Sequence, residues 1–320
     1  MKFATIGHLL DKNTIKQIPE DWIHKNLVIS PEININGTKG YITGLKLTAK
    51  EMVNLPIEDV RQNILDAVVY IQDELGVDLI QLGALTTSVT SGGKWLVDQK
   101  EYTGYVNHGD SYTAAVTCQA VLKALNQSGK NPSNLIIAIV GAYGVIGEAT
   151  SKILVPQFKH SILIGRREEK LKELAEKVEG SFETTIELKT KDADIIITAT
   201  SHPTALLNSD HLKNNAIVVD VSQPPNLSSD VCQKRHDIMR IDGGYVDFPE
   251  EHAFLIPGIP KGKNFACIAE VVMQAMEDKH ENHVGSIDLD HLHKTEKWAK
   301  RYGYTLKELT NFGKSINKTG

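Results

Sequence analysis

The chain has 320 residues, more than one ordinary hydrophobic core accommodates, which predicts two domains. Its composition, 41% hydrophobic and 23% charged, is typical of a folded globular protein, and a formal net charge of -5 argues against a nucleic-acid partner. No run reaches the roughly 18 continuous apolar residues of a membrane helix, and the N-terminus has no signal-peptide core. We therefore expect a cytoplasmic protein without a membrane span.

Residues 1–129 are predicted to form an α/β substrate or catalytic domain. Strands are expected at residues 2–9, 26–33 and 76–89, and a helix at 57–76 because Val60, Ile64 and Ala67 recur at helical spacing before Gly76. A second helix is expected at 111–129. The polar stretch that follows favours a domain boundary at residue 129.

Residues 130–258 alternate between strand and helix patterns. Strands are expected at 135–141, 161–166, 193–200 and 215–221, with helices at 148–158 and 169–180. This alternation predicts an α/β fold with a doubly wound parallel sheet, a Rossmann domain. Residues 259–320 are predicted to supply C-terminal helices, at 259–281 and around 298–312, that return to the cleft between the domains.

A glycine-rich turn at residues 141–147 follows the first strand of the Rossmann domain and opens a helix. In this context Gly141 permits a tight turn, Gly144 lets the backbone approach a pyrophosphate, and Gly147 allows close packing of helix on strand. The turn predicts a dinucleotide site; a glycine-rich turn without ligand is the alternative. The predicted cofactor-binding residues of the turn are Gly141, Ala142, Tyr143, Gly144, Val145, Ile146 and Gly147.

The end of the next strand carries Arg166 and Arg167, where NAD-specific proteins usually carry an acidic residue. Because a guanidinium pairs with a 2′-phosphate, the sequence favours NADPH as cofactor, with a solvated basic turn as the alternative. Thr200 and Ser201 follow a later strand and are expected beside the nicotinamide ribose.

The three cysteines have no C-x-x-C spacing and are expected to be reduced. Cys118 fits a helix core and Cys232 a polar loop. Cys267 follows the basic loop Lys261–Lys263 and falls in the first turn of a helix, where amide dipoles and lysines are expected to lower its pKa. That position suits a nucleophile, although a buried core cysteine fits the same pattern. No metal site is expected.

Several segments together resemble the long-chain fatty acyl-ACP reductases of cyanobacteria. They are residues 6–9, 76–89, 108–115, 141–147, 193–201, 243–244 and, most specifically, 259–270 with the sequence IPKGKNFACIAE. The resemblance implies NADPH-dependent reduction of an acyl thioester to an aldehyde, with Cys267 as the acyl-accepting residue. Residues 220–225 (DVSQPP) depart from the pattern, which leaves the acyl length and the carrier, acyl carrier protein or CoA, open.

The expected mechanism also needs groups that stabilise an oxyanion. Ser88, Ser111 and Thr113 are the candidates, with helix capping or core packing as the alternative for Ser111 and Thr113. The fold is similar to shikimate dehydrogenase and glutamyl-tRNA reductase. Two other functions stay open: a shikimate-type dehydrogenase with direct hydride transfer and no thiol, and a non-catalytic NADP(H)-sensing protein. The sequence leaves the oligomeric state open.

Overall fold

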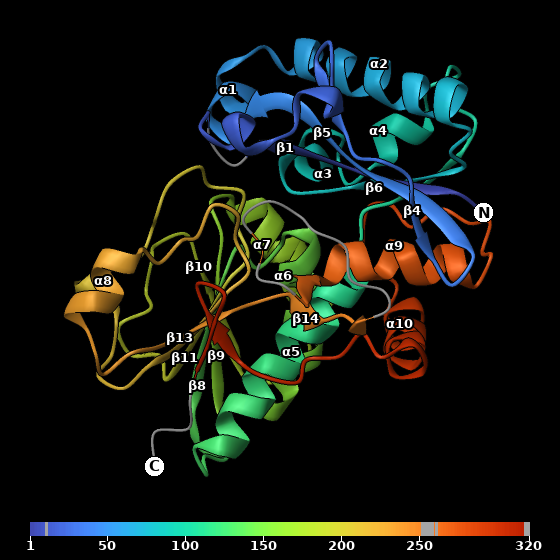
Figure 1. Ribbon diagram of the computed structural model, residues 1–320. Helices are drawn as coiled ribbons and strands as arrows, with labels where there is room; N and C mark the ends of the chain where they lie inside the picture. Colours follow the sequence, from blue (N-terminus) through green and yellow to red (C-terminus); the bar gives the residue numbers. More distant parts are fainter. Residues whose placement is uncertain (10–11, 251–258, 260–261, 317–320) are drawn as a thin grey trace. The chain divides into compact units, whose positions relative to one another are not determined.

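The computed structural model describes residues 1–9, 12–250, 259 and 262–316 (Figure 1). The chain forms two compact units. The first comprises Met1–Tyr112 and Val246–Thr305, and the second comprises Thr113–Tyr245 and Leu306–Gly320. Within the described ranges no helix is long and apolar enough to cross a membrane.

The first unit is built on a seven-stranded sheet with the order β2-β3-β5-β1-β6-β7, and β4 pairs with β5. Strands β5, β1, β6 and β7 are mutually parallel, so their carboxyl ends share one edge of the sheet. The strands are β1 (Phe3–Leu9), β2 (Ile23–His24), β3 (Leu27–Ile29), β4 (Ile33–Ile35), β5 (Thr38–Thr48), β6 (Leu79–Leu82) and β7 (Tyr105–Asn107).

Helices cover both faces of this sheet (Figure 1). On one face α2 (Ile57–Leu75) buries its apolar stripe against Ile6 and Ile80, and it ends at Gly76 in the left-handed conformation. On the other face α9 (Ala266–Met276) packs against β6 and β1. The remaining helices of this unit are α1 (Ala49–Asn54), α3 (Leu85–Val89), α4 (Lys94–Val97), α10 (Leu289–Tyr302), η1 (Thr14–Gln17) and η2 (Glu20–Trp22).

The second unit has a six-stranded, fully parallel sheet with the order β10-β9-β8-β11-β12-β13, which is the Rossmann order. The strands are β8 (Ile136–Val140), β9 (His160–Ile164), β10 (Phe182–Thr185), β11 (Ile195–Thr198), β12 (Ile217–Asp220) and β13 (Met239–Asp242). Besides most of α5 (Asp110–Gln127), the helices are α6 (Val145–Leu154), α7 (Glu168–Ala175), α8 (Ser229–Lys234), η3 (Pro132–Asn134), η4 (Val155–Gln157) and η5 (Ser209–His211).

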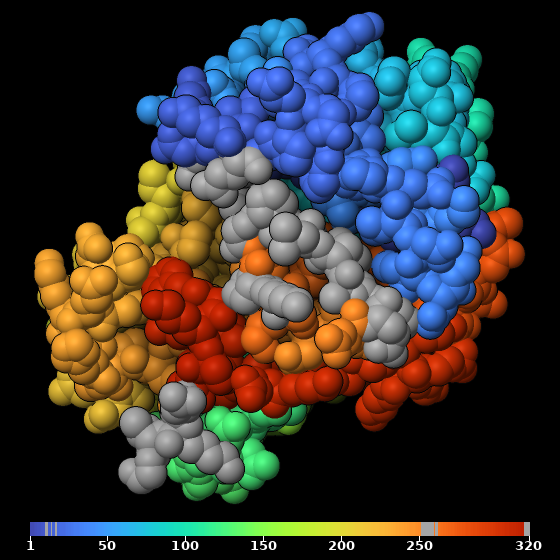
Figure 2. All heavy atoms as spheres, viewed as in Figure 1, coloured from blue at the N-terminus to red at the C-terminus, as the bar shows by residue number. Residues whose placement is uncertain are grey.

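The C-terminal segment completes the second unit. Strand β16 (Thr310–Asn311) contacts β13 and pairs with β17 (Lys314–Ser315), red at the surface in Figure 2. Asp242 accepts hydrogen bonds from the backbone N–H groups of Phe312 and Gly313. A further two-stranded pair joins β14 (Tyr245–Asp247) to β15 (Lys263–Phe265).

The predicted α/β fold class with a doubly wound Rossmann sheet is confirmed, and several elements differ from prediction. Residues 85–89 form α3 instead of continuing a strand, because Ala84 has a φ of +54° that breaks the extended backbone. The predicted helix at 298–312 is wrong beyond Tyr302, where Gly303 ends α10 in the left-handed conformation.

The compact units also divide the chain differently from the predicted ranges 1–129, 130–258 and 259–320. The division falls within α5 (Asp110–Gln127) because Val121 and Leu125 of this helix pack into the Rossmann core with Ile137. Residues 246–305 belong to the first unit, and 306–320 to the second. The predicted boundary at 258 lies outside the described residues.

Candidate functional site

The candidate site of the first unit lies at the carboxyl edge of its sheet. His8 lies near the end of β1, Gly83 follows β6, and His108 follows β7. Because these strands are parallel, their ends meet at one edge, where parallel α/β sheets place their ligands. Cys267 joins this edge from the first turn of α9.

The backbone of Gly109 lies directly against Cys267. Gly109 has a φ of +71°, and a Cβ atom added to it would come within 2.5 Å of the Cβ atom of Cys267. Glycine is therefore required at this position on two grounds, backbone conformation and space. The contact brings the next residue, Asp110 at the start of α5, close enough for its charge to act on the Cys267 thiol.

The thiol of Cys267 is free and half-buried. Burial raises its pKa to about 12, and the charges of Asp110 and Glu270 act in the same direction. The expectation of a net lowering is therefore wrong, although the backbone amides at the helix start do act to lower this pKa. Lys263 is paired with Asp247 at 2.9 Å, and the helix amides act more weakly than burial; Lys261 lies outside the described residues. At neutral pH the group is a thiol, so a nucleophilic role requires a base.

His108 and Asp110 are coupled through the turn before α5. The Nδ1 atom of His108 accepts a hydrogen bond from the backbone N–H of Asp110 at 2.9 Å and lies 3.8 Å from the Oδ2 atom of Asp110. Burial lowers the pKa of His108 to about 4, so its imidazole is neutral with the proton on Nε2. Among the described residues, that buried Nε2 has no hydrogen-bond partner.

A buried carboxylate, Glu270, ties α9 to the start of α5. Its Oε2 atom accepts the backbone N–H of Tyr112 at 2.7 Å, and its Oε1 atom lies 3.1 Å from the Nε2 atom of His291. Burial raises the pKa of Glu270, but the hydrogen bond with His291, the charges that His291 and His108 carry when they are protonated, and the Tyr112 N–H together lower it to about 2. The ring of His291 stacks on His283 at 3.4 Å between centroids.

A second polar pair holds α9 against β7. The Nδ2 atom of Asn107 donates to the Oε1 atom of Gln274 at 2.6 Å, and its Oδ1 atom accepts the N–H of Gly109 at 2.5 Å. Both side chains are fully buried. Sequence analysis missed this network. The available signal was the presence of Glu270 and Gln274, four residues apart, within an otherwise apolar helix.

The three predicted oxyanion-stabilising residues have different environments. Ser88 is exposed on α3. Ser111 is buried inside the first turn of α5, and Thr113 is buried with its methyl group near Gly244. Because α5 begins at Asp110, Ser111 lies inside the helix and is not the residue that caps its N-terminus.

The glycine turn of the second unit follows β8, which lies between β9 and β11 where the strand order reverses. This is the point at which Rossmann sheets bind dinucleotides. A Cβ atom added to Gly141 would lie 2.3 Å from the carbonyl oxygen of Ala199, and one on Gly147 would lie 2.1 Å from that of Gly141. Gly144 precedes α6, and Ala142, Val145 and Ile146 complete the turn and the first helical residues. The close packing of turn, helix and strand fits a dinucleotide cradle.

Tyr143 contacts Gly165, Arg166 and Arg167, the three residues that follow β9. Its ring occupies the space beside Gly165, where an added Cβ atom would meet it at 2.3 Å, and its hydroxyl oxygen accepts the N–H of Arg166 at 3.1 Å. The guanidinium of Arg167 lies 5.5 Å from the centre of the Tyr143 ring, a cation–π distance. Both arginines are exposed and free to meet an anion.

Thr200 holds the loop after β11. Its hydroxyl donates to the Oδ1 atom of Asn226 at 2.6 Å, and its N–H donates to the hydroxyl of Ser222 at 3.0 Å. Ser201, the other predicted residue of this loop, is exposed. The Thr200 side chain therefore fixes the loop through Asn226, while Ser201 is available to a ligand.

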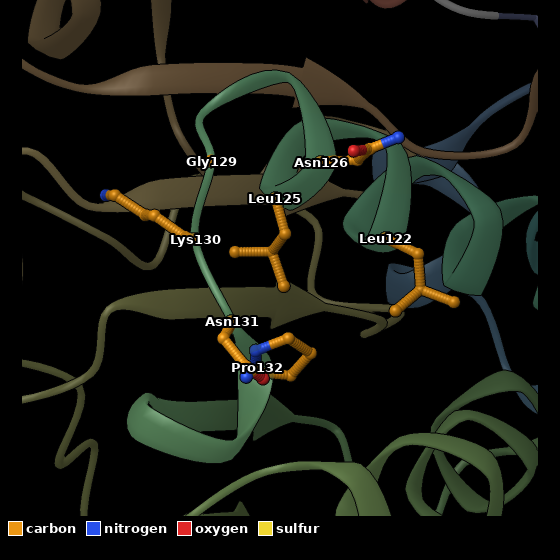
Figure 3. A pocket seen from close by; sticks show the side chains of 7 residues that line it. All are labelled: Leu122, Leu125, Asn126, Gly129, Lys130, Asn131 and Pro132. Atoms are coloured by element: carbon orange, nitrogen blue, oxygen red, sulfur yellow. The ribbon is translucent and has the colours of Figure 1, made fainter.

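A hollow of about 340 Å³ lies elsewhere in the second unit (Figure 3). It is lined by Leu122, Leu125, Asn126, Gly129, Lys130, Asn131 and Pro132. These residues precede β8, at the amino edge of the Rossmann sheet, whereas dinucleotides bind at the carboxyl edge. The hollow contains none of the predicted site residues. Across the described ranges, no three His, Cys, Asp or Glu side chains are grouped to hold a metal ion.

Comparisons with known proteins match both units. Residues 123–243 match the family model described as "Shikimate / quinate 5-dehydrogenase". The chain is 26% identical to "Aminotransferase PigE" of Serratia sp. over 298 residues, which cover 88% of this chain and 34% of that protein. It is 26% identical to "Long-chain acyl-[acyl-carrier-protein] reductase" of Synechococcus elongatus over 238 residues, 69% of this chain and 68% of that one.

The chain thus spans about a third of the length of the first of these relatives. Among solved structures it is similar to L-tryptophan dehydrogenase from Nostoc punctiforme, with 14% identity, a TM-score of 0.44, and coverage of 95% of this chain and 84% of that one. The Rossmann strand order, the glycine cradle and the family match together identify the second unit as an NAD(P)H-binding domain.

Proposed function

We propose that the chain is an NADPH-dependent reductase that converts an acyl thioester, carried by acyl carrier protein or CoA, to the aldehyde through an acyl group on Cys267. The observation that carries the proposal is the half-buried Cys267 thiol packed on Gly109 beside Asp110, at the carboxyl edge of a parallel sheet. The 26% identity to a long-chain acyl-ACP reductase supports the acyl substrate.

The proposed reaction has two stages. The Sγ atom of Cys267 loses its proton and bonds to the acyl carbon, the bond from that carbon to the carrier sulfur breaks, and the carrier leaves as a thiol. NADPH, when bound at the glycine turn, supplies a hydride. Reduction at the acyl carbon leaves the alkoxide of a hemithioacetal on Cys267. Its collapse breaks the carbon–sulfur bond, releases the aldehyde and returns the thiolate, which regains a proton from solvent.

The preference for NADPH over NADH rests on the second unit. Arg166 and Arg167 are exposed at the end of β9, and Tyr143 packs against the guanidinium of Arg167. A guanidinium recognises a phosphate by charge-assisted hydrogen bonds. Both arginines are therefore proposed to meet the 2′-phosphate.

The test is aldehyde formation from hexadecanoyl-CoA and NADPH by the native protein and by Cys267→Ser. A serine hydroxyl is much less acidic than a thiol and a far weaker nucleophile, so the variant should form no aldehyde while binding NADPH normally. Cys232→Ser, at the half-buried thiol of α8, is the matched control and should keep native activity. Native turnover by Cys267→Ser would refute the covalent route.

A shikimate-type dehydrogenase with direct hydride transfer is the second candidate, favoured by the family match over residues 123–243. It expects Cys267 to be dispensable and a small hydroxy acid to be oxidised with NADP⁺. Turnover of shikimate or quinate, unchanged in Cys267→Ser, would favour this candidate over acyl reduction.

A further inference from the structure

The backbone of Gly109 packs against Cys267, which brings Asp110, the next residue, beside it, and Glu270 lies on the same helix α9 as Cys267. Of these two carboxyl groups, only that of Asp110 is suited to exchange a proton with the thiol. The charges of Asp110 and Glu270 both act on this thiol. Glu270 is fully buried, and its two oxygens are occupied by the Tyr112 N–H and by His291. These contacts favour its ionised form, so Glu270 is a poor proton acceptor.

Asp110 is placed differently. Its carboxylate makes no hydrogen bond to a described residue, and its nearest ion-pair partner, the Nδ1 atom of His108, lies 3.8 Å away. Its side chain keeps 16% of its surface exposed, so protons can pass to solvent or to a bound carrier. Burial, and then the charge of Glu270, raise the pKa of Asp110 well above its ordinary value. The difference between this pKa and that of the Cys267 thiol is thereby smaller, which favours proton transfer between them.

We propose that Asp110 is a catalytic residue that takes the proton of the Cys267 thiol and passes it to the departing carrier sulfur. This inference rests on the proposed function. As the Sγ atom bonds to the acyl carbon, its proton moves to a carboxylate oxygen of Asp110. When the tetrahedral adduct collapses, the bond from carbon to carrier sulfur breaks and the proton moves from Asp110 to that sulfur. The carboxylate is regenerated, and no other reactant is consumed.

The experiment measures the rate at which hexadecanoyl-CoA acylates Cys267 without NADPH, by rapid quench and intact mass, from pH 6 to 10. Asp110→Asn should be about 100-fold slower or worse at pH 7, because general-base assistance is lost. The deficit should shrink toward pH 10, where hydroxide ionises the thiol directly. Asp98→Asn, an exposed aspartate of the same unit, is the control and should match the native rate. Equal rates, or a deficit that stays constant with pH, would overturn the role of Asp110.

Asp110→Glu keeps the carboxyl group and separates chemistry from folding. Asp110→Glu should acylate Cys267 at about a tenth of the native rate or faster, because its carboxylate can still act as a general base. If Asp110→Asn does not fold, a folded Asp110→Glu with native-like acylation supports the proposal, and one without acylation overturns it. Failure of the native protein to acylate would instead remove the proposed function itself.

Discussion

Gly109 packs against Cys267 so closely that an added Cβ atom would lie 2.5 Å from the Cβ atom of the cysteine. Gly109→Ala should therefore lower the free energy of unfolding by about 2–5 kcal/mol, from a φ of +71° and from overlap with Cys267. Gly76→Ala isolates the backbone effect, because Gly76 has a φ of +63° with nothing within 4 Å, and should cost about 1–2 kcal/mol. Urea unfolding of both variants measures this difference. Equal losses of unfolding free energy in the two variants would contradict the close contact between Gly109 and Cys267.

Arg167→Ala should weaken NADPH binding by about 1.5–3 kcal/mol, the value of a hydrogen bond to a charged group, and leave NADH almost unchanged. The reason is that only NADPH carries the 2′-phosphate. Lys172→Ala removes a neighbouring exposed charge of α7 and should affect neither nucleotide. Titration calorimetry measures the binding free energy of both nucleotides. Equal weakening of NADPH and NADH binding would show that Arg167 does not contact the 2′-phosphate.

Acid should destabilise the fold through His108. Its pKa is 6.5 in the unfolded chain and about 4 in the folded protein, so the unfolded chain binds a proton that the folded protein does not. The free energy of unfolding should thus fall as pH falls from 6.5 to 4, by about 3 kcal/mol from this residue. Its contribution is complete above pH 6.5.

Urea unfolding between pH 8 and 4 measures this dependence. His108→Asn keeps an acceptor for the Asp110 N–H and should reduce the slope between pH 6.5 and 4 by the share of this residue. The remaining slope is expected from His283, whose pKa burial also lowers to about 4. His24→Gln, at an exposed histidine, should leave the slope unchanged. If the free energy of unfolding of His108→Asn depended on pH as steeply as that of the native protein, His108 would be ruled out as a source of this dependence.

The Rossmann unit was predictable because its central strands are uninterrupted apolar runs, as in Ile195–Thr198, and its glycine turn has a local spacing rule. Strand β13 escaped prediction because it carries Arg240. That charge is tolerated in the core through ion pairs with Asp220 of β12 and Asp242 of β13 itself.

The candidate site was predictable only at Cys267, through its motif. The neighbours of the thiol come from a distant part of the chain, with Gly109 just before α5 and Asp110 as the first residue of α5. No local spacing links residues that lie 157 or 158 positions apart in the chain. The pKa of Cys267 was mispredicted for the same reason, because burial and the Asp110 charge arise only on folding.

The covalent route is tested most directly by mixing the protein with hexadecanoyl-CoA in the absence of NADPH and recording the intact mass, followed by peptide mapping. One hexadecanoyl group should appear on the peptide containing Cys267 and be absent in Cys267→Ser. Addition of NADPH should then discharge that group as hexadecanal. Aldehyde formation by a native protein that never carries the acyl group on Cys267 would contradict the account.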